Sequence, residues 1–388
     1  MREITELGIG TLNIKDIVPA STKVDFRTFS RLLDEERVVA SYKMYWLLAI
    51  LDEVSHGKTE IEFNKLISRM IVYAWYPTMQ YKLSFGVFDN LKKPISHIAL
   101  KYAYPANCDE RKLLEFIYKC EDADLKKIMK DLTLNVPYRL LSPFFSHELR
   151  GQKDSLKNSI ITELSLKDNI CLYKIIKGDK DKIIINEGWA EYLKDNYKVI
   201  KCWIYYKLIC FLQKRNPNVP AIAFKLDAPK SRNLTKVARL WNQVISDKGI
   251  RDIYTGKDFV SENFEAYGSL SIDHFIPWSF VMHDEMWNLV PTFKNINSRK
   301  NDKLLSFDEY IGDFCEVQYK AFSYLCEKKL DKDLESYVDG LRIEEPYRLK
   351  DKKGEEEFTR KLRECLSPLY QIARNQGFEV MGNLYLVK

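Results

Sequence analysis

The chain has 388 residues, of which 46% are hydrophobic and 30% are charged, and its formal net charge is +6. A sequence of this length suits two or three modules rather than one small domain, and this composition excludes a disordered chain. The modest positive charge favours polyanionic partners only mildly, and it excludes the strong basicity of a protein that coats DNA.

The first half of the chain shows the apolar periodicity of helices. Apolar residues recur three and four positions apart over 36–77, 107–132 and 187–217. The exception is 171–186, where two short apolar runs flank Gly-Asp-Lys-Asp and predict a β-hairpin. A further amphipathic helix is predicted over 231–245.

The pattern changes near residue 250. Short apolar runs over 250–277, with Gly256 and Gly268 at turn positions, predict two short strands separated by a loop. Residues 283–304 are predicted to form a loop and a short helix. Helical periodicity returns after residue 306 and continues towards the C-terminus. We therefore predict a mainly α protein, in which a helical region (1–245) and a helical tail (307–388) flank a compact mixed module (246–306).

Cysteine usage and apolar runs bear on the compartment. The eight cysteines form no CxxC pair, and their spacing does not resemble that of a zinc ribbon. Residues 1–10 lack the apolar core of a signal peptide, and no stretch of 18 apolar residues occurs. We expect a cytoplasmic protein with reduced thiols and no membrane partner.

One group of polar residues in the mixed module has the composition of a phosphodiesterase site. Asp273 precedes His274, Asn288 follows fourteen residues after the histidine, and Asn297 and Lys300 share one face of a predicted short helix. A carboxylate and an amide oxygen are hard ligands that suit Mg²⁺ or Mn²⁺. A neutral imidazole nearby suits a general base that takes a proton from an attacking water.

These residues lie in a stretch, "IYTGKDF…LSIDHFIPWSF…MWNLVPTFKNINSRKNDKL", that resembles the HNH (ββα-metal) endonuclease family. It is especially similar to the HNH domain of RNA-guided CRISPR nucleases. The resemblance implies the following roles: Asp273 and Asn297 as metal ligands, His274 as general base, Asn288 as a brace for the histidine loop, and Lys300 as a basic residue that faces the phosphate. Pro277 and Ser279 continue the same motif.

The sequence departs from many HNH domains in one respect. Those domains hold the hairpin with a zinc ion bound by two CxxC pairs, whereas Tyr-Thr-Gly-Lys at 254–257 stands where the first pair would fall. We expect Mg²⁺ or Mn²⁺ as the cofactor and no structural zinc. Packing must then brace the hairpin, and Trp278, Phe280 and Trp287 are candidates for it.

Two alternatives within the module stay open. Asn295 competes with Asn297 for the metal if the helix begins one residue earlier or later. His283 and Asp284 precede Trp287 in a loop and are interpreted as surface residues, with a role in binding substrate or metal as the alternative. The candidate nucleic-acid-binding residues are Lys294, Arg299, Lys300 and Lys303, together with Arg232, Lys236 and Arg239 along one side of the predicted helix over 231–245.

The resemblance implies a metal-dependent endonuclease that hydrolyses DNA and leaves 5′-phosphate and 3′-hydroxyl ends, as in antiviral defence or a mobile element of bacteria. The alternatives are a catalytically silent nucleic-acid-binding or scaffold subunit and an HNH nuclease that cleaves RNA. One site cuts one strand, so breaking a duplex would need a homo-oligomer, repeated nicking or a partner. A regulatory ATPase or sensor protein is a further possible partner. Residues 1–245 would then supply specificity, partner docking or oligomerisation.

Overall fold

The computed structural model describes residues 18–167, 169–229, 232–349 and 352–382. The expectation about residues 1–10 and the predicted helix start at Ser231 lie outside this part. The chain forms two compact units. The first contains the residues up to Pro217 together with Lys225–Ala228, and the second contains Asn218–Phe224 and the residues from Pro229 onwards.

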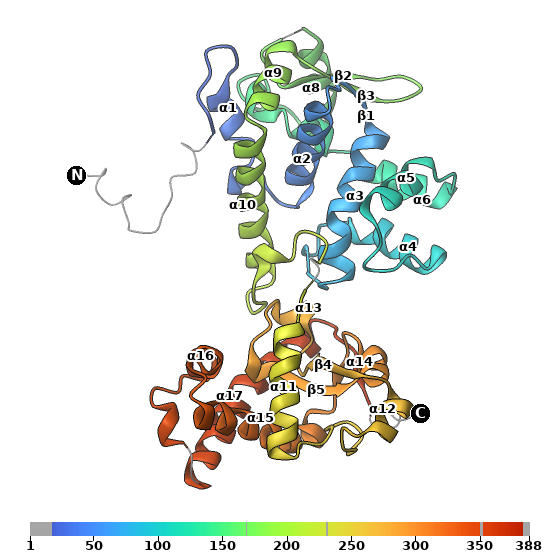
Figure 1. The fold of residues 1–388 in the computed structure, drawn as a ribbon. Helices are drawn as coiled ribbons and strands as arrows, with labels where there is room; N and C mark the ends of the chain where they lie inside the picture. Colours follow the sequence, from blue (N-terminus) through green and yellow to red (C-terminus); the bar gives the residue numbers. More distant parts are fainter. Residues whose placement is uncertain (1–17, 168, 230–231, 350–351, 383–388) are drawn as a thin grey trace, which may run out of the picture. The chain divides into compact units, whose positions relative to one another are not determined.

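The first unit is built mainly from helices, as predicted (Figure 1). Its α-helices are α1 (Phe26–Ser30), α2 (Tyr42–Ser55), α3 (Phe63–Met79), α4 (Lys92–Tyr102), α5 (Glu110–Lys119), α6 (Ala123–Leu132), α7 (Val136–Arg139), α8 (Lys157–Lys167), α9 (Glu187–Asp195) and α10 (Tyr197–Arg215). Short 3-10 helices are η2 (Glu35–Arg37), η3 (Ser142–Phe145) and η4 (Asp154–Leu156). Helix α2 packs between α3 and α10 and supplies much of the core.

A small antiparallel sheet completes this unit. Strands β2 (Tyr173–Ile176) and β3 (Lys182–Ile185) form the predicted hairpin, with Ile175 opposite Ile183. Strand β1 (Glu60–Glu62) pairs with the other edge of β3. The prediction of helix for 60–62 was therefore wrong, because the ladder with β3, which lies more than 100 residues away in the sequence, decides the conformation of these residues.

The second unit contains the mixed module and the C-terminal helices (Figure 1). Its elements are η5 (Ile222–Phe224), α11 (Thr235–Lys248), α12 (Ser261–Tyr267), β4 (Leu270–His274), α13 (Trp278–Val281), η6 (Met286–Asn288), β5 (Leu289–Phe293), α14 (Lys294–Lys300), β6 (Leu304–Leu305), α15 (Phe307–Lys328), α16 (Asp331–Leu341), η7 (Pro346–Arg348), α17 (Lys352–Asn375) and β7 (Val380–Met381). The fold is mainly α, as predicted.

The centre of this unit is a ββα element. Strands β4 and β5 are antiparallel, with His274 opposite Leu289, and α14 follows β5 without an intervening loop. Helix α11 packs against β4, and α15 packs against β5 and α11. The predicted boundaries at residues 246 and 307 thus fall inside one compact unit, because the helices on both sides of the hairpin cover it.

Buried side chains tie β5 to the C-terminal helices. Gln318 on α15 donates a hydrogen bond of 2.6 Å to the carbonyl of Leu289, and Tyr337 on α16 donates one of 2.6 Å to the Gln318 amide oxygen. All three residues are fully buried. Because unpaired buried polar groups are costly, this chain of hydrogen bonds fixes the position of the hairpin relative to α15 and α16.

Two general features of the chain accompany this fold. None of the helices in the described part of the chain has the length and apolar character needed to cross a membrane. The eight cysteines all lie in described residues, and none of them forms a disulfide bond.

Candidate active site

The carboxylate of Asp273 lies in the interior, at the end of β4. Asp273 is 3% exposed. The ammonium of Lys300 on α14 lies 2.9 Å from Oδ2 of Asp273 and 3.1 Å from Oδ1. The hydroxyl of Tyr254 also donates to Oδ2. Burial and the adjacent carboxylate raise the pKa of Tyr254 well above its ordinary value, so the phenol stays a donor. The carboxylate of Asp273 is thus buried and held by two neighbouring side chains, Lys300 and Tyr254.

Lys300 has a different position from the predicted one. The side chain is fully buried, and besides its ion pair with Asp273 it donates a hydrogen bond of 2.7 Å to the carbonyl of His274. The expectation that Lys300 faces the phosphate is therefore not met. Helix α14 turns this residue inwards against β4, where a buried carboxylate requires a counter-charge.

His274 follows Asp273 at the edge of the interior. Its side chain is 7% exposed, and its Nε2 atom lies 2.9 Å from Oδ1 of Asp284. Arg232 holds the same carboxylate oxygen at 3.0 Å. Burial lowers the pKa of His274 below its ordinary value, although the hydrogen bond to Asp284 acts in the opposite direction. The imidazole is therefore neutral near pH 7, which is the form that accepts a proton.

Asn288 clamps the turn that follows His274. Its side chain is fully buried, its Oδ1 accepts a hydrogen bond of 2.8 Å from the amide of Ile276, and its Nδ2 donates one of 2.9 Å to the carbonyl of the same residue. The amide of Phe275 donates to the backbone carbonyl of Asn288. Both polar groups of the Asn288 side chain are thus used to hold the backbone two residues beyond the histidine.

The replacement Asn288→Ala is expected to destabilise the turn by about 2–4 kcal/mol, because it leaves the buried amide and carbonyl of Ile276 without partners. Hydrogen–deuterium exchange should show lost protection at 275–288 and unchanged protection in α2. Asn263→Ala is the matched control, since the Asn263 amide bonds only the exposed carbonyl of Asp258. Equal exchange at 275–288 in the two variants would contradict the clamp.

Asn297 is anchored to β4 from α14. Its Nδ2 donates to Ser271 Oγ at 2.8 Å and to the carbonyl of Ile272 at 3.1 Å. A carbonyl only accepts, so this contact fixes which end of the amide is the nitrogen. Within the described residues, the amide oxygen of Asn297 has no hydrogen-bond partner. It is therefore available as a ligand, one turn of helix away from Lys300.

Asn295, the alternative ligand, has a different environment. It is exposed at the start of α14, and its amide oxygen lies 3.1 Å from the position that a Cβ would take at Gly268. Gly268 has φ +89°, and it ends α12 just before β4. Asn295 thus lies beside this turn, whereas Asn297 contacts the strand that carries Asp273.

The donors fit a hard divalent cation. A carboxylate offers about four acceptor positions, and Lys300 and Tyr254 leave acceptor capacity on Oδ1 of Asp273. Carboxylate and amide oxygens are suitable ligands for Mg²⁺ or Mn²⁺, which usually retain several waters. The described residues contain no group of three or more His, Cys, Asp or Glu side chains suited to a metal. A cation here would depend on Asp273, Asn297 and oxygens of water or substrate.

The predicted basic residues of the ββα element divide into two groups. Lys294 and Arg299 are exposed on α14 and present positive charge next to the site. Lys303 lies just beyond that helix, 3.4 Å from Glu379, with a side chain that is about one-third exposed. Lys300 is buried, as described above. Lys294 and Arg299 are therefore the exposed residues among these four.

The prediction that Arg232, Lys236 and Arg239 lie along one helix face was wrong for Arg232. Helix α11 begins at Thr235, so Arg232 precedes it and reaches His274 and Asp284 instead. Lys236 forms an exposed ion pair of 2.9 Å with Asp333 on α16. Arg239 is exposed on α11. Of the three, Arg232 alone touches the proposed catalytic residues.

Two residues at the site were not predicted to belong to it. Asp284 was interpreted as a surface residue, and Tyr254 was noted only as standing where a CxxC pair would fall. The structure brings Asp284 to His274 and Tyr254 to Asp273. Their polar groups, ten residues after His274 and nineteen before Asp273, were visible in the sequence, but only the tertiary path of the loops shows that they converge.

Aromatic packing braces the hairpin at the predicted positions. Phe280 is fully buried and meets Phe378 edge to face at 5.8 Å. Trp287 packs closely on α16, where a Cβ at Gly340 would lie 2.2 Å from its indole nitrogen, so only glycine fits there. Trp278 is half-buried, and the guanidinium of Arg232 lies 4.4 Å from its ring centroid. Trp278 therefore packs against Arg232 and lies only partly in the core.

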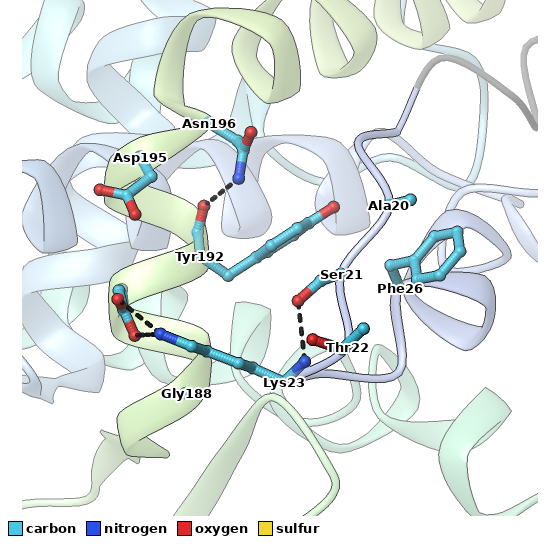
Figure 2. A pocket seen from close by; sticks show the side chains of 10 residues that line it. Ala20, Ser21, Thr22, Lys23, Phe26, Gly188, Tyr192, Asp195 and Asn196 are labelled. Carbon is cyan, nitrogen blue, oxygen red and sulfur yellow. Dashed lines mark hydrogen bonds and ion pairs between the residues drawn. The ribbon is translucent and has the colours of Figure 1, made fainter.

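A separate pocket of about 540 Å³ lies in the first unit, between α9 and the segment Ala20–Lys23 (Figure 2). Its polar groups are largely paired with one another. Lys23 reaches the carboxylate of Glu191 at 2.8 Å, and the Asn196 amide donates to the backbone carbonyl of Tyr192. The lining of this pocket contains no histidine and therefore differs from the group of residues around His274.

Comparison with known families agrees with the geometry of the second unit. Residues 252–305 match the family described as HNH endonuclease, and this match spans Tyr254, β4, β5 and α14. Neither a curated protein nor a solved structure shows a significant match to the chain. Residues 252–305 are thus similar to an HNH endonuclease domain, while Arg232, α11 and the helices from α15 onwards lie outside the match.

Proposed function

We propose that the second unit is a metal-dependent endonuclease that hydrolyses phosphodiester bonds in DNA. The observation that supports this most is the convergence at the end of β4. Asp273 and His274 are adjacent, and α14 anchors Asn297 to the same strand. A carboxylate and an amide are suitable metal ligands and an imidazole is a suitable general base, so these groups can support metal-assisted phosphodiester hydrolysis.

In this mechanism Asp273 and Asn297 would hold Mg²⁺ or Mn²⁺, which supplies stabilisation of the negative charge that develops on the phosphate and the leaving oxygen. His274 takes one proton from the attacking water. The oxygen of that water bonds to phosphorus, and the bond between phosphorus and the 3′ oxygen breaks. The 3′ oxygen leaves with the bonding electrons and takes up a proton from solvent, while His274 returns its proton to solvent, giving 5′-phosphate and 3′-hydroxyl ends.

The other residues of the site position these groups. Lys300 is the counter-charge of Asp273 on the interior side and acts without contact with the substrate. Asn288 fixes the turn after His274. Lys294 and Arg299, exposed on α14, would contact backbone phosphates and so add affinity that falls with salt concentration.

The chain around the HNH domain would decide where and when cleavage occurs. We assign specificity, partner docking or oligomerisation to the first unit. One site cuts one strand, so a double-strand break requires two copies or repeated nicking. Antiviral defence or a mobile element is the biological setting that the family resemblance implies, and a regulatory ATPase or sensor protein would fit that setting.

The direct test is cleavage by the full-length protein of supercoiled plasmid and of an RNA transcript of the same sequence, with Mg²⁺, Mn²⁺ or EDTA. The proposal expects nicked or linear plasmid with either metal and none with EDTA. Cleavage of the transcript alone would reassign the substrate to RNA. Binding of DNA without cleavage under all conditions would favour a silent scaffold and overturn the proposal.

A further inference from the structure

We propose that Asp284 is a positioning residue that fixes the tautomer of His274, so that Nδ1 is the atom that takes the proton from water. This inference rests on the proposed function for its catalytic meaning, but its structural core stands on contacts of the second unit. Asp284 lies in the loop between α13 and η6, ten residues after the histidine. The sequence gives no helical or strand spacing that would pair the two side chains.

The contact between Asp284 and His274 determines where the imidazole carries its hydrogen. An ionised carboxylate has acceptor sites only. Nε2 of His274 lies 2.9 Å from Oδ1 of Asp284, which is hydrogen-bond distance. Two lone pairs facing each other at that distance would repel, so Nε2 must be the donor. In a neutral imidazole the lone pair is then on Nδ1.

Arg232 supports this assignment. Its Nη1 lies 3.0 Å from Oδ1 of Asp284, and a guanidinium carries donors only. The positive charge beside Asp284 keeps that carboxylate ionised. Arg232 is itself held over the ring of Trp278 at 4.4 Å, so the carboxylate is gripped by a side chain that has a fixed position of its own.

The competing arrangement is less consistent with the distances. Arg232 Nη1 also lies 3.4 Å from Nε2 of His274, and a bare Nε2 would accept from it. That bond would be long, whereas the contact between the histidine and the carboxylate is 2.9 Å. It would also place the Nε2 lone pair against the carboxylate. The geometry points to one donor, Nε2–H, and one shared acceptor, Asp284 Oδ1.

The consequences for catalysis concern both position and charge. Among the described residues, Nδ1 of His274 has no hydrogen-bond partner, so its lone pair is available to a water. When Nδ1 takes the proton, the imidazole becomes positive, and the carboxylate of Asp284 stabilises that charge. Asp284 therefore acts on the reaction through His274 and does not need to touch the substrate.

The structural part is tested by ¹⁵N NMR of the full-length protein labelled at histidine, without metal. His274→Gln identifies the signals of this residue among the five histidines. We expect the Nε2–H tautomer in the wild type and a mixture of tautomers in Asp284→Ala. An Nδ1–H tautomer in the wild type, or an unchanged tautomer in Asp284→Ala, would overturn the inference whether or not the protein cleaves DNA.

The catalytic part is tested by steady-state cleavage. Asp284→Ala should lower kcat by about 10- to 100-fold with little change in KM, as is typical when the partner of a functional histidine is lost. Asp284→Glu should restore part of kcat. Asp313→Ala, which removes an exposed carboxylate on α15, is the matched control and should behave as wild type. Equal kcat in Asp284→Ala and Asp313→Ala would count against the inference. If the wild-type protein did not cleave with metal present, that result would count against the proposed function alone.

Discussion

Replacing His274 with Ala is expected to lower the rate of metal-dependent DNA cleavage by about 10²- to 10⁴-fold, the usual contribution of a positioned general base. The imidazole stands next to Asp273 at the end of β4, and the backbone that follows it is clamped by Asn288. Among the described residues no second histidine lies at this position. The carboxylates of Asp273 and Asp284 remain, but a carboxylate is a weaker base than an imidazole.

The measurement is single-turnover cleavage of a labelled duplex at saturating protein. His147→Ala is the matched control, because His147 is an exposed histidine of the first unit. The wild type, His274→Ala and His147→Ala should bind the uncut duplex in EDTA with similar affinity. The lower cleavage rate of His274→Ala then arises in the chemical step. A His274→Ala rate within a few-fold of the wild-type rate would remove His274 from the mechanism.

Replacing Lys300 with Met is expected to lower the free energy of unfolding of the second unit by about 3–5 kcal/mol, since it leaves a buried carboxylate without its counter-charge. Lys300 is fully buried, and its ammonium lies within 3.1 Å of both Asp273 oxygens. The hydrogen bond to the carbonyl of His274 is lost as well. Cleavage should fall together with stability, because the position of Asp273 depends on this pair.

Pulse proteolysis in urea, with fragments of the two units resolved by mass, measures this effect. Lys303→Met is the control, because Lys303 pairs with an exposed Glu379 and such pairs contribute about 0–1 kcal/mol. The double variant Lys300→Met with Asp273→Asn should regain much of the stability but no cleavage. A Lys300→Met midpoint equal to that of Lys303→Met would contradict the buried ion pair.

Local sequence patterns were sufficient for much of the fold. The period of apolar residues identified helices such as α2, α3, α10 and α15 but not α4, α8 or α12, and the two short runs at 171–186 identified the hairpin of β2 and β3. The family resemblance implied a ββα element, but the local pattern predicted both strands within 250–277. The structure has β4 there, together with helix α12, and β5 lies in the segment that was predicted as loop. Strand β1 was missed because its partner β3 is remote in the sequence.

The sequence predicted which residue types occur at the site better than it predicted which groups those residues contact. The three-residue step correctly placed Asn297 and Lys300 on one side of α14, where both contact β4. That step cannot say which side of the helix meets solvent, and the burial of Lys300 follows from the charge of Asp273. Asp284 and Arg232 reach His274 only through the tertiary course of two loops, which no periodicity encodes.

The variants Asn297→Ala and Asn295→Ala test most directly whether Asp273 and Asn297 form a cation-dependent cleavage site. Both replaced residues belong to α14, but only Asn297 is anchored to β4 with its amide oxygen available. Plasmid cleavage is measured as a function of Mg²⁺ and Mn²⁺ concentration. We expect Asn295→Ala to match the wild type and Asn297→Ala to need at least about tenfold more metal or to lose cleavage altogether. Identical metal dependence in both variants would contradict the site proposed here.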